Sequence, residues 1–419
     1  VILDMIKKII DLRLDEMLDV DYGTSTYAKW AGHILGIELQ PKDFRGMDGA
    51  QAERLARDEA QRQIETQLYD AIEENLPEGE DETEWNWEAL AKFIDARWGL
   101  SLRDRDLKKA GRAEVGELII GKVTEAIEHQ DLTEGAKFLD RSFPLQSVCA
   151  WMRQKFSIEL TPDELRGLDT PTVKKLILER VVAAYQEKEA EYPVLAGLMH
   201  FSRGAAGGDP AQRHIDRDGV VAWARERFQV ELQLEDLKNK QRDEIRDTLV
   251  DNSRKFQSQA DAALADAKSR IERIFNSAHD ANATAGEAAG SGDALTSLVA
   301  WLHDDLQSEL KLEDLALLTR EPFERRVTGA VEDFYRPEIR GMERRLVLFV
   351  LDAAWKDHLL AMDHLRSSVG MRGVAQMDPK VEYRREGMRT FETMWDNIGD
   401  QVTDMVFRVE QLNEDFIGS

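Results

Sequence analysis

The feature that most constrains this chain is an internal repeat in which an aromatic residue opens each copy. Apolar residues follow that aromatic residue at intervals of five, seven, nine and fourteen residues, and Ser308 is the one departure. Residues 156–165, 228–237 and 306–315 read FSIELTPDEL, FQVELQLEDL and LQSELKLEDL, and are close variants of one another. The five copies are marked by Trp30, Phe93, Trp151, Trp223 and Trp301. Such a repeat dictates the architecture because every copy should fold in the same way.

Each copy predicts a helix that carries the aromatic residue, a short extended piece, an acidic turn and a longer second helix. The unequal spacing of the copies argues against a tightly stacked solenoid of fixed period. We therefore expect small helical modules, each with its own core, joined by helical spacers. The aromatic residues are expected to pack into those cores, and a peptide-binding groove is the alternative explanation of the same spacing.

The end of the chain, residues 343–413, has a different pattern. Apolar residues recur at helical spacing, first around Phe349 and Leu360 and again around Trp395, with a break at residues 370–378. Asp378 and Pro379 suit the start of the second helix. This pattern predicts two long helices joined by a tight loop, an αα-hairpin with an apolar and basic tip. The alternative is that the methionines and the valine of the loop fold back on the hairpin's own core.

Composition narrows the fold and the function. Of the 419 residues, 42% are hydrophobic and 33% charged, few segments alternate as strands do, and the net charge is −25. We expect an all-α fold with minor extended segments and no nucleic-acid partner, because phosphates need cations in number. The single cysteine, Cys149, excludes an intramolecular disulfide and fits a buried apolar position.

The predicted domains follow the repeats. They are listed here in chain order: a helical segment at 1–22; the five helical repeats at 23–76, 77–140, 141–209, 210–292 (with a helical spacer and a Gly/Ala linker) and 293–337; and the hairpin with a terminal helix at 338–419.

No motif for catalysis is present. The chain has no phosphate-binding loop of the form GxxxxGK[ST] and no acidic box for Mg²⁺, so we expect no catalytic residues and no cofactor in it. His358 and His364 lie six residues apart, on different faces of a helix, so no metal site is expected either. Whether the protein is an enzyme stays open from these residues.

Residues 351–394 resemble the two-helix finger of SecA, the bacterial preprotein translocase motor. The SecA pattern, roughly LW-x-x-HL-x-x-MD-x-LR, LRGYAQ-x-DP-x-x-EYK-x-E and F-x-x-M, is met at Trp355, His358, Leu359, Met362, Asp363, Leu365, Arg366, Arg372, Gly373, Ala375, Gln376, Asp378, Pro379, Glu382, Tyr383, Glu386, Phe391 and Met394. Val374 replaces the usual Tyr at the tip, and Arg384 the usual Lys. Each repeat is similar to the helical wing of SecA, whose Y-x-x-K-E ending matches Tyr185, Lys188 and Glu189. An ordinary SecA has one wing module, whereas this chain has about five.

The resemblance implies the carboxy-terminal part of a SecA-like subunit without its motor domains. In that family a finger couples ATP-driven motion to the movement of an unfolded preprotein through the SecY channel. It implies ATP and Mg for the full-length parent, and a cytoplasmic protein peripherally bound to the inner membrane. Chaperones are further candidate partners of the wing modules. The alternative is a motor-less interaction scaffold whose helical repeats bind peptides or partner proteins.

The resemblance also assigns roles to residues. The finger tip, expected to contact the channel and the preprotein, comprises Met371, Arg372, Gly373, Val374, Ala375, Gln376 and Met377. The residues expected to pack the finger on the scaffold are Trp355, Leu359, Met362, Leu365, Tyr383 and Phe391.

Overall fold

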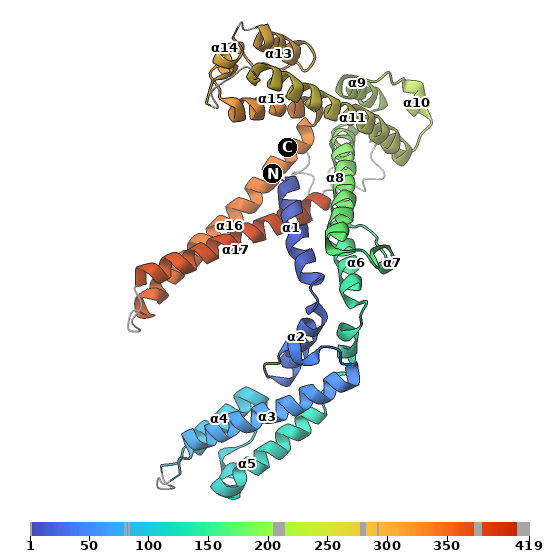
Figure 1. The fold of residues 1–419 in the computed structure, drawn as a ribbon. Coiled ribbons are helices and arrows are strands. Elements are labelled where there is room, and N and C mark those ends of the chain that lie inside the picture. The colour runs from blue at the N-terminus through green and yellow to red at the C-terminus, as the bar shows by residue number, and fades with distance from the viewer. Residues whose placement is uncertain are drawn as a thin grey trace. The chain divides into compact units, whose positions relative to one another are not determined.

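The computed structural model describes residues 2–78, 82, 84–203, 214–276, 282–290, 293–372 and 379–408. Helices dominate this part of the chain, as Figure 1 shows, and its two strands, β1 (Ser202–Arg203) and β2 (His214–Ile215), form one short antiparallel pair. The predicted all-α class with minor extended segments is confirmed. None of the described helices is long and apolar enough to cross a membrane.

The helices of the first half follow the repeat pattern. In chain order they are α1 (Ile2–Met17), α2 (Tyr22–Leu35), η1 (Pro41–Phe44), α3 (Gly49–Asn75), α4 (Trp87–Trp98), α5 (Asp104–Glu128), η2 (Thr133–Leu139), α6 (Phe143–Phe156), α7 (Pro162–Leu165) and α8 (Thr170–His200). The two η elements are 3₁₀ helices. Helix α5 has a kink at Gly111, whose φ of 72° is not helical.

The second half continues in the same way and ends in the hairpin. Its helices are α9 (Arg217–Phe228), α10 (Leu234–Lys238), α11 (Arg242–Phe275), α12 (Ala285–Ala288), α13 (Asp293–Asp304), α14 (Leu312–Ala316), α15 (Arg320–Tyr335), α16 (Pro337–Arg372) and α17 (Pro379–Phe407). We number the repeats 1 to 5 by their aromatic residues, which lie on α2, α4, α6, α9 and α13.

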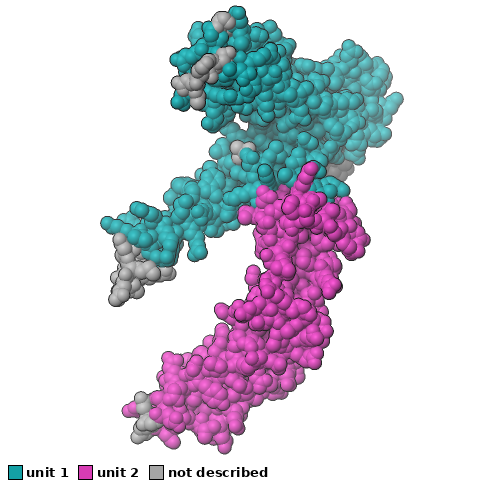
Figure 2. All heavy atoms as spheres, viewed as in Figure 1, with its two compact units in different colours: residues 1–9, 155–158, 176–419 teal, residues 10–154, 159–175 magenta. Residues whose placement is uncertain are grey.

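The chain divides into two compact units, coloured separately in Figure 2. Unit 1 contains residues 1–9, 155–158 and 176–419, and unit 2 contains residues 10–154 and 159–175. Unit 2 therefore holds repeats 1 and 2, unit 1 holds repeats 4 and 5 with the hairpin, and repeat 3 contributes to both. The finer domain boundaries drawn from the sequence stay predictions.

Within each unit, two repeats share one hydrophobic core. In unit 2 a single cluster of buried residues extends from Tyr27 to Leu132, and α3 of repeat 1 packs along α5 of repeat 2. In unit 1 a second cluster extends from Ala190 to Tyr335, and α11 of repeat 4 packs along α15 of repeat 5. The expectation that every module has its own core is thus wrong. The reason is that a single repeat has no second surface to cover the apolar side of its long helix.

The buried side of the long second helix is a regular stripe, which is apolar except at Ser253 and Gln257. Counted from the aromatic residue of each repeat, positions 22, 26, 30 and 34 lie on the long second helix and are buried in all five copies. A spacing of four residues places these side chains one above another on one helix face. The stripe residues are Ala52, Ala56, Ala60, Ile64; Val115, Ile119, Val123, Ile127; Val173, Ile177, Val181, Tyr185; Ile245, Leu249, Ser253, Gln257; and Phe323, Val327, Val331, Tyr335.

The first helix of every repeat ends in a left-handed residue, six positions after the aromatic residue. Gly36 and Gly99 fill this position in repeats 1 and 2, with φ of 68° and 66°. Ser157, Gln229 and Gln307 fill it in the other repeats, with φ of 57°, 52° and 50°. A side chain with a Cβ is strained in this region, whereas glycine is not. Five copies therefore share one backbone turn, and three of them keep it against the preference of their residue.

This strain can be measured by exchanging residues between repeats. We expect Gln307→Gly to raise the free energy of unfolding by about 1 kcal/mol, because the glycine removes the left-handed strain. Gly99→Ala should lower it by about the same amount, and a Cβ at Gly99 would meet no other atom within 4 Å, so no clash confuses the result. Urea unfolding followed by circular dichroism checks both. Equal stability of all three proteins would contradict the assignment.

Candidate functional site: the hairpin and the joint at its base

Helices α16 and α17 form the predicted hairpin and pack along each other (Figure 1). Leu346 and Val350 on α16 and Ile398 and Val402 on α17 are buried. Towards the tip the seam is closed by Met362, whose side chain lies over Gly387; a Cβ added there would come within 2.9 Å of the Met362 methyl carbon. The hairpin is therefore held by its own interior contacts.

Aromatic rings cross the middle of the hairpin. His358 lies between Trp355 and Phe391, with ring centroids 5.5 and 5.8 Å away, and Phe391 in turn contacts Trp395. The His358 ring is buried, and its Nδ1 atom has no hydrogen-bond partner among the described residues. It borders a groove of about 440 Å³ between the two helices, whose α16 wall is formed mainly by small residues such as Ala354 and Ala361.

The outer faces of the hairpin are unusually apolar for a surface. Six apolar side chains there are about half exposed or more, namely Leu348, Phe349, Leu359, Leu360, Val381 and Met388. Two tryptophans, Trp355 and Trp395, are about two fifths exposed. The sequence pattern groups Phe349, Leu360 and Trp395 with the apolar stripes of the two helices. They are nevertheless exposed, because the hairpin offers only one interior seam. An apolar surface of this extent is typical of a place where another protein segment binds.

The predicted finger residues fall into three groups. Met362, Leu365, Tyr383 and Phe391 are partly buried. Trp355 and Leu359 are 43% and 50% exposed, so in the described part of the chain they are not packed on a scaffold helix. At the tip, Met371 and Arg372 end α16, while Gly373, Val374, Ala375, Gln376 and Met377 lie outside the described residues. The roles of all these residues stay predictions.

The aromatic residues of the repeats are partly buried in every copy. Four of them, Trp30, Phe93, Trp223 and Trp301, pack against the shared cores. Gly135 and Gly197 make room for two of these rings, since a Cβ at either glycine would come within 2.4 to 2.5 Å of Trp30 or Trp223. The geometry thus accounts for these residues by core packing, and a peptide-binding role for them stays the alternative.

The base of the hairpin joins repeat 3 to the wing formed by repeats 4 and 5. Between α15 and α16 a single residue, Arg336, leaves the helical conformation, with φ of −133°. Its guanidinium Nη1 lies 3.4 Å from the Glu189 carboxylate on α8, and its Nη2 lies 3.6 Å from Asp261 on α11. Gln257 of α11 also donates a 2.7 Å hydrogen bond to the backbone oxygen of Glu189. Arg336 therefore connects three helices at the point where the wing becomes the hairpin.

Two carboxylates at this joint are strongly affected by burial. Glu189 is 5% exposed, and burial raises its pKa to about 7 against the opposing effect of Arg336. Burial likewise raises the pKa of Glu343 on α16 to about 7, and the Tyr185 hydroxyl donates a hydrogen bond to it. Tyr185 and Glu189 are the outer residues of the Y-x-x-K-E match, so this motif lies at the joint.

A second contact at the base could not have been predicted from the sequence. Lys155, at the end of α6, is 6% exposed, and its ammonium lies 2.7 Å from the Asp400 carboxylate and 2.8 Å from that of Asp404 on α17. Beside it, the rings of Phe156 and Phe407 meet edge to face at 5.0 Å. No pattern around Lys155 distinguishes it from a surface lysine of an amphipathic helix.

Within the described ranges no group of three or more His, Cys, Asp or Glu residues is placed to hold a metal ion. What the described residues define is thus a helical scaffold: paired repeats that form a wing, a buried polar joint, and a long hairpin with apolar faces. Comparison with known proteins shows what this scaffold is similar to. Residues 211–410 match the family model described as the SecA Wing and Scaffold domain.

The whole chain is similar to a curated SecA as well. It is 43% identical over 419 residues to "Protein translocase subunit SecA 1" of Rhodopirellula baltica, covering all of this chain and 33% of that protein. SecA subunits of Frankia casuarinae and Ralstonia nicotianae match 26% and 23% of the chain, at 40% and 43% identity, over 11% of their own lengths. No solved structure matches. Residues 211–410 are thus a SecA wing and scaffold domain, within a chain that spans about a third of the relative it matches throughout.

The contact of the buried Lys155 with Asp400 and Asp404 can be tested from both sides, by removing either the ammonium or the carboxylates. Replacing both aspartates (Asp400→Asn with Asp404→Asn) should cost about 3–5 kcal/mol of unfolding free energy, because it leaves a buried ammonium without a carboxylate. Lys155→Met should cost far less, since the two carboxylates are 48% and 38% exposed and water can solvate them. The midpoints of urea unfolding of the two variants measure this difference in stability. A Met variant as unstable as the double Asn variant would contradict this account.

The joint should also make stability depend on pH. Because the pKa of Glu189 is raised in the folded state, its contribution is fully present below the ordinary pKa of glutamate and is lost as the pH rises through 7. Through Glu189 the free energy of unfolding should fall by up to about 3 kcal/mol between pH 5 and 8. Glu189→Gln should remove this part of the slope and leave the part that Glu343 contributes. Urea unfolding across this range measures it. Glu187→Gln, on the same helix but in an exposed pair with Arg254, is the matched control and should keep the slope.

Proposed function

We propose that this chain is the part of a SecA-like translocase that carries ATP-driven motion to the preprotein. The observation that supports this most is the contrast along the hairpin. Its base is fixed by Lys155 and by the Arg336 joint, while its outer faces are apolar and open. A hairpin that is fixed at its base and exposes apolar side chains along its length can bind another polypeptide chain and move it.

In this proposal the motor lies in the remainder of the longer protein and binds ATP and Mg there. The hairpin tip, Met371 to Met377, inserts at the mouth of the SecY channel and contacts the unfolded preprotein. The protein acts in the cytoplasm, peripherally bound to the inner membrane. The relative from Rhodopirellula baltica, named a protein translocase subunit, supports these partners, because it is similar to the chain from end to end.

We further propose that the groove between α16 and α17 receives one more helix, from the scaffold of the longer protein. Small side chains such as Ala354 and Ala361 allow a helix backbone to approach closely. The buried Nδ1 atom of His358 offers a hydrogen-bonding position to a polar group on that helix. The exposed Trp355 and Leu359 would then be covered, in agreement with their predicted role in finger-scaffold packing.

A second candidate function rests on the repeats. Repeats 1 to 3 lie outside the residues that match the SecA wing, and repeats 1 and 2 build a further shared core. A motor-less scaffold whose repeats bind peptides, chaperones or other partner proteins would use these extra surfaces. The domain boundaries predicted from the sequence belong to both proposals.

Photocrosslinking in the full-length protein, with the channel and a stalled preprotein, separates the two. A photoreactive residue at Val374 should crosslink to the channel or the preprotein. One at Leu359 should crosslink to an upstream segment of the same polypeptide. One at Leu317, which is 77% exposed on the wing, is the control and should give neither product. Crosslinks from Val374 to this chain alone would count against a working finger and favour the interaction scaffold.

A further inference from the structure

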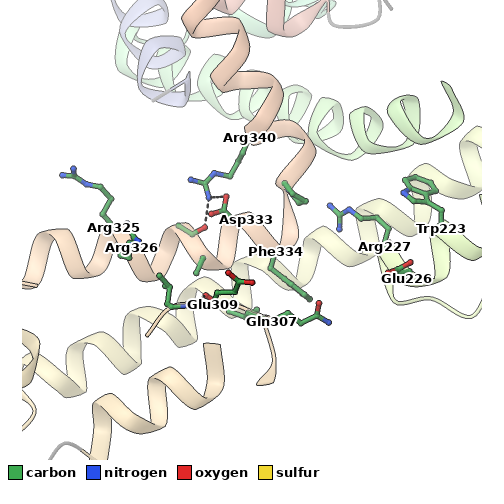
Figure 3. A pocket seen from close by; sticks show the side chains of 16 residues that line it. Trp223, Glu226, Arg227, Gln307, Glu309, Arg325, Arg326, Asp333, Phe334 and Arg340 are labelled. Carbon is green, nitrogen blue, oxygen red and sulfur yellow. Dashed lines mark hydrogen bonds and ion pairs between the residues drawn. The ribbon is translucent and has the colours of Figure 1, made fainter. Parts of the chain in front are cut away.

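The wing carries a groove of about 920 Å³ under the elbow where α15 turns into α16 (Figure 3). Apolar side chains along it come from several elements: Trp223 of α9, Leu306 and Leu310 of repeat 5, and Phe334 of α15. Part of its wall is the non-helical strip formed by residues 307–310, which lies between α13 and α14. The groove therefore combines an apolar lining with a stretch of accessible backbone.

The backbone of this strip is only partly paired. The N–H of Ser308 donates to the oxygen of Leu302, and the N–H of Leu310 donates a long 3.4 Å bond to the Ser308 hydroxyl. In the part of the chain that the structure describes, neither the N–H nor the C=O of Glu309 makes a hydrogen bond. Unpaired peptide groups beside an apolar groove are what an added peptide strand needs in order to bind.

In repeats 3 and 4 the residue two positions after the aromatic one is an arginine that contacts the equivalent strip. In repeat 4 Arg225 donates to the oxygen of Leu232, and in repeat 3 Arg153 forms an ion pair with Glu159 at 2.7 Å. In repeat 5 that position is His303, whose Nδ1 lies 3.1 Å from its neighbour Asp304 instead. In repeat 5 the side chain at this position therefore contacts Asp304 and not the strip.

Charge around the groove indicates what kind of segment would fit. Arg227 and Arg340 are already occupied, by Glu338 and Asp333. Arg325 and Arg326 lie together at one end of the groove, as Figure 3 shows. Arg325 forms only an exposed pair with Glu321, of a kind that contributes little, and Arg326 has no ion pair among the described residues. One end of the groove can therefore receive carboxylates.

We propose that this groove binds an extended peptide segment with acidic residues at one end. The peptide pairs its backbone with Glu309, places apolar side chains against Leu310 and Phe334, and its carboxylates meet Arg325 and Arg326. This goes beyond the proposed function, because it requires neither a motor nor a channel. It also differs from a role of the aromatic residues as anchors, since here the backbone of the strip provides the recognition.

The test uses the whole 419-residue chain and defined peptides, with binding followed by fluorescence anisotropy. The probe is a fluorescein-labelled peptide of sequence DDVTVTV. Two control peptides accompany it: the same sequence with alternate amides N-methylated, which cannot pair as a strand, and KKVTVTV, in which the charge is reversed. We expect DDVTVTV to bind with a dissociation constant in the micromolar range, and both controls to bind about tenfold more weakly or not at all.

Variants locate the binding to the strip and the arginines. Glu309→Pro removes the open N–H and should weaken binding about tenfold, whereas Glu309→Ala keeps the N–H and should not. Glu231→Pro is the matched control, at the same position in the strip of repeat 4, and should bind like the unaltered chain. Arg325→Glu with Arg326→Glu should reverse the preference in favour of KKVTVTV, a result that does not depend on the proline variant folding.

The proposal is overturned by any of three results. They are equal binding of the N-methylated peptide, equal effects of the proline and alanine variants at Glu309 in well-folded protein, or no binding of DDVTVTV up to about 1 mM. None of these bears on translocation, and a failure of the Val374 crosslink would leave this test unaffected. The two proposals can therefore fail separately.

Discussion

Every long second helix of this chain buries a stripe of side chains four residues apart, and a lone helix cannot bury such a stripe. The repeats solve this in pairs: α3 packs along α5, and α11 along α15. A fully buried valine, leucine or isoleucine contributes about 1.5–3 kcal/mol, so a pair of four-residue stripes is a large part of what holds a wing together. The wing is therefore a pair of repeats, and the residues that match the SecA wing include both repeats 4 and 5.

Two consequences follow for the rest of the chain. Repeats 1 and 2 repeat the same paired arrangement around a core of their own, outside the residues that match the SecA wing. Repeat 3 has no such partner repeat. Its stripe on α8 ends in Tyr185, whose hydroxyl bonds Glu343 of α16 and whose ring lies 6.3 Å from that of Phe407 on α17. The end of this stripe is thus covered by the base of the hairpin.

The sequence predicts what is local and misses what is not. The order of helix, connecting strip and longer helix follows from apolar spacing, and so does the hairpin, whose second helix begins at Pro379. The pairing of repeats depends on contacts between distant segments that share no pattern, so separate cores were expected. The left-handed turn can be predicted from a glycine only in repeats 1 and 2. In the other repeats Ser157, Gln229 and Gln307 occupy this position, and their residue types do not predict a left-handed conformation. Lys155 and Glu189 look like surface residues of amphipathic helices, since their partners lie far away in sequence.

The polar contacts at the joint fix one arrangement of its helices, which the burial of apolar groups alone would not explain. Breaking a buried ion pair is costly, while replacing it with apolar residues is often neutral, so such pairs are better at fixing one arrangement than at adding stability. Arg336 is the one residue between α15 and α16 that leaves the helical conformation. A rotation of the hairpin about this residue would separate its guanidinium from Glu189 and Asp261. Such a movement would leave buried charge without its partner, so these contacts favour the arrangement of hairpin and wing that is seen here.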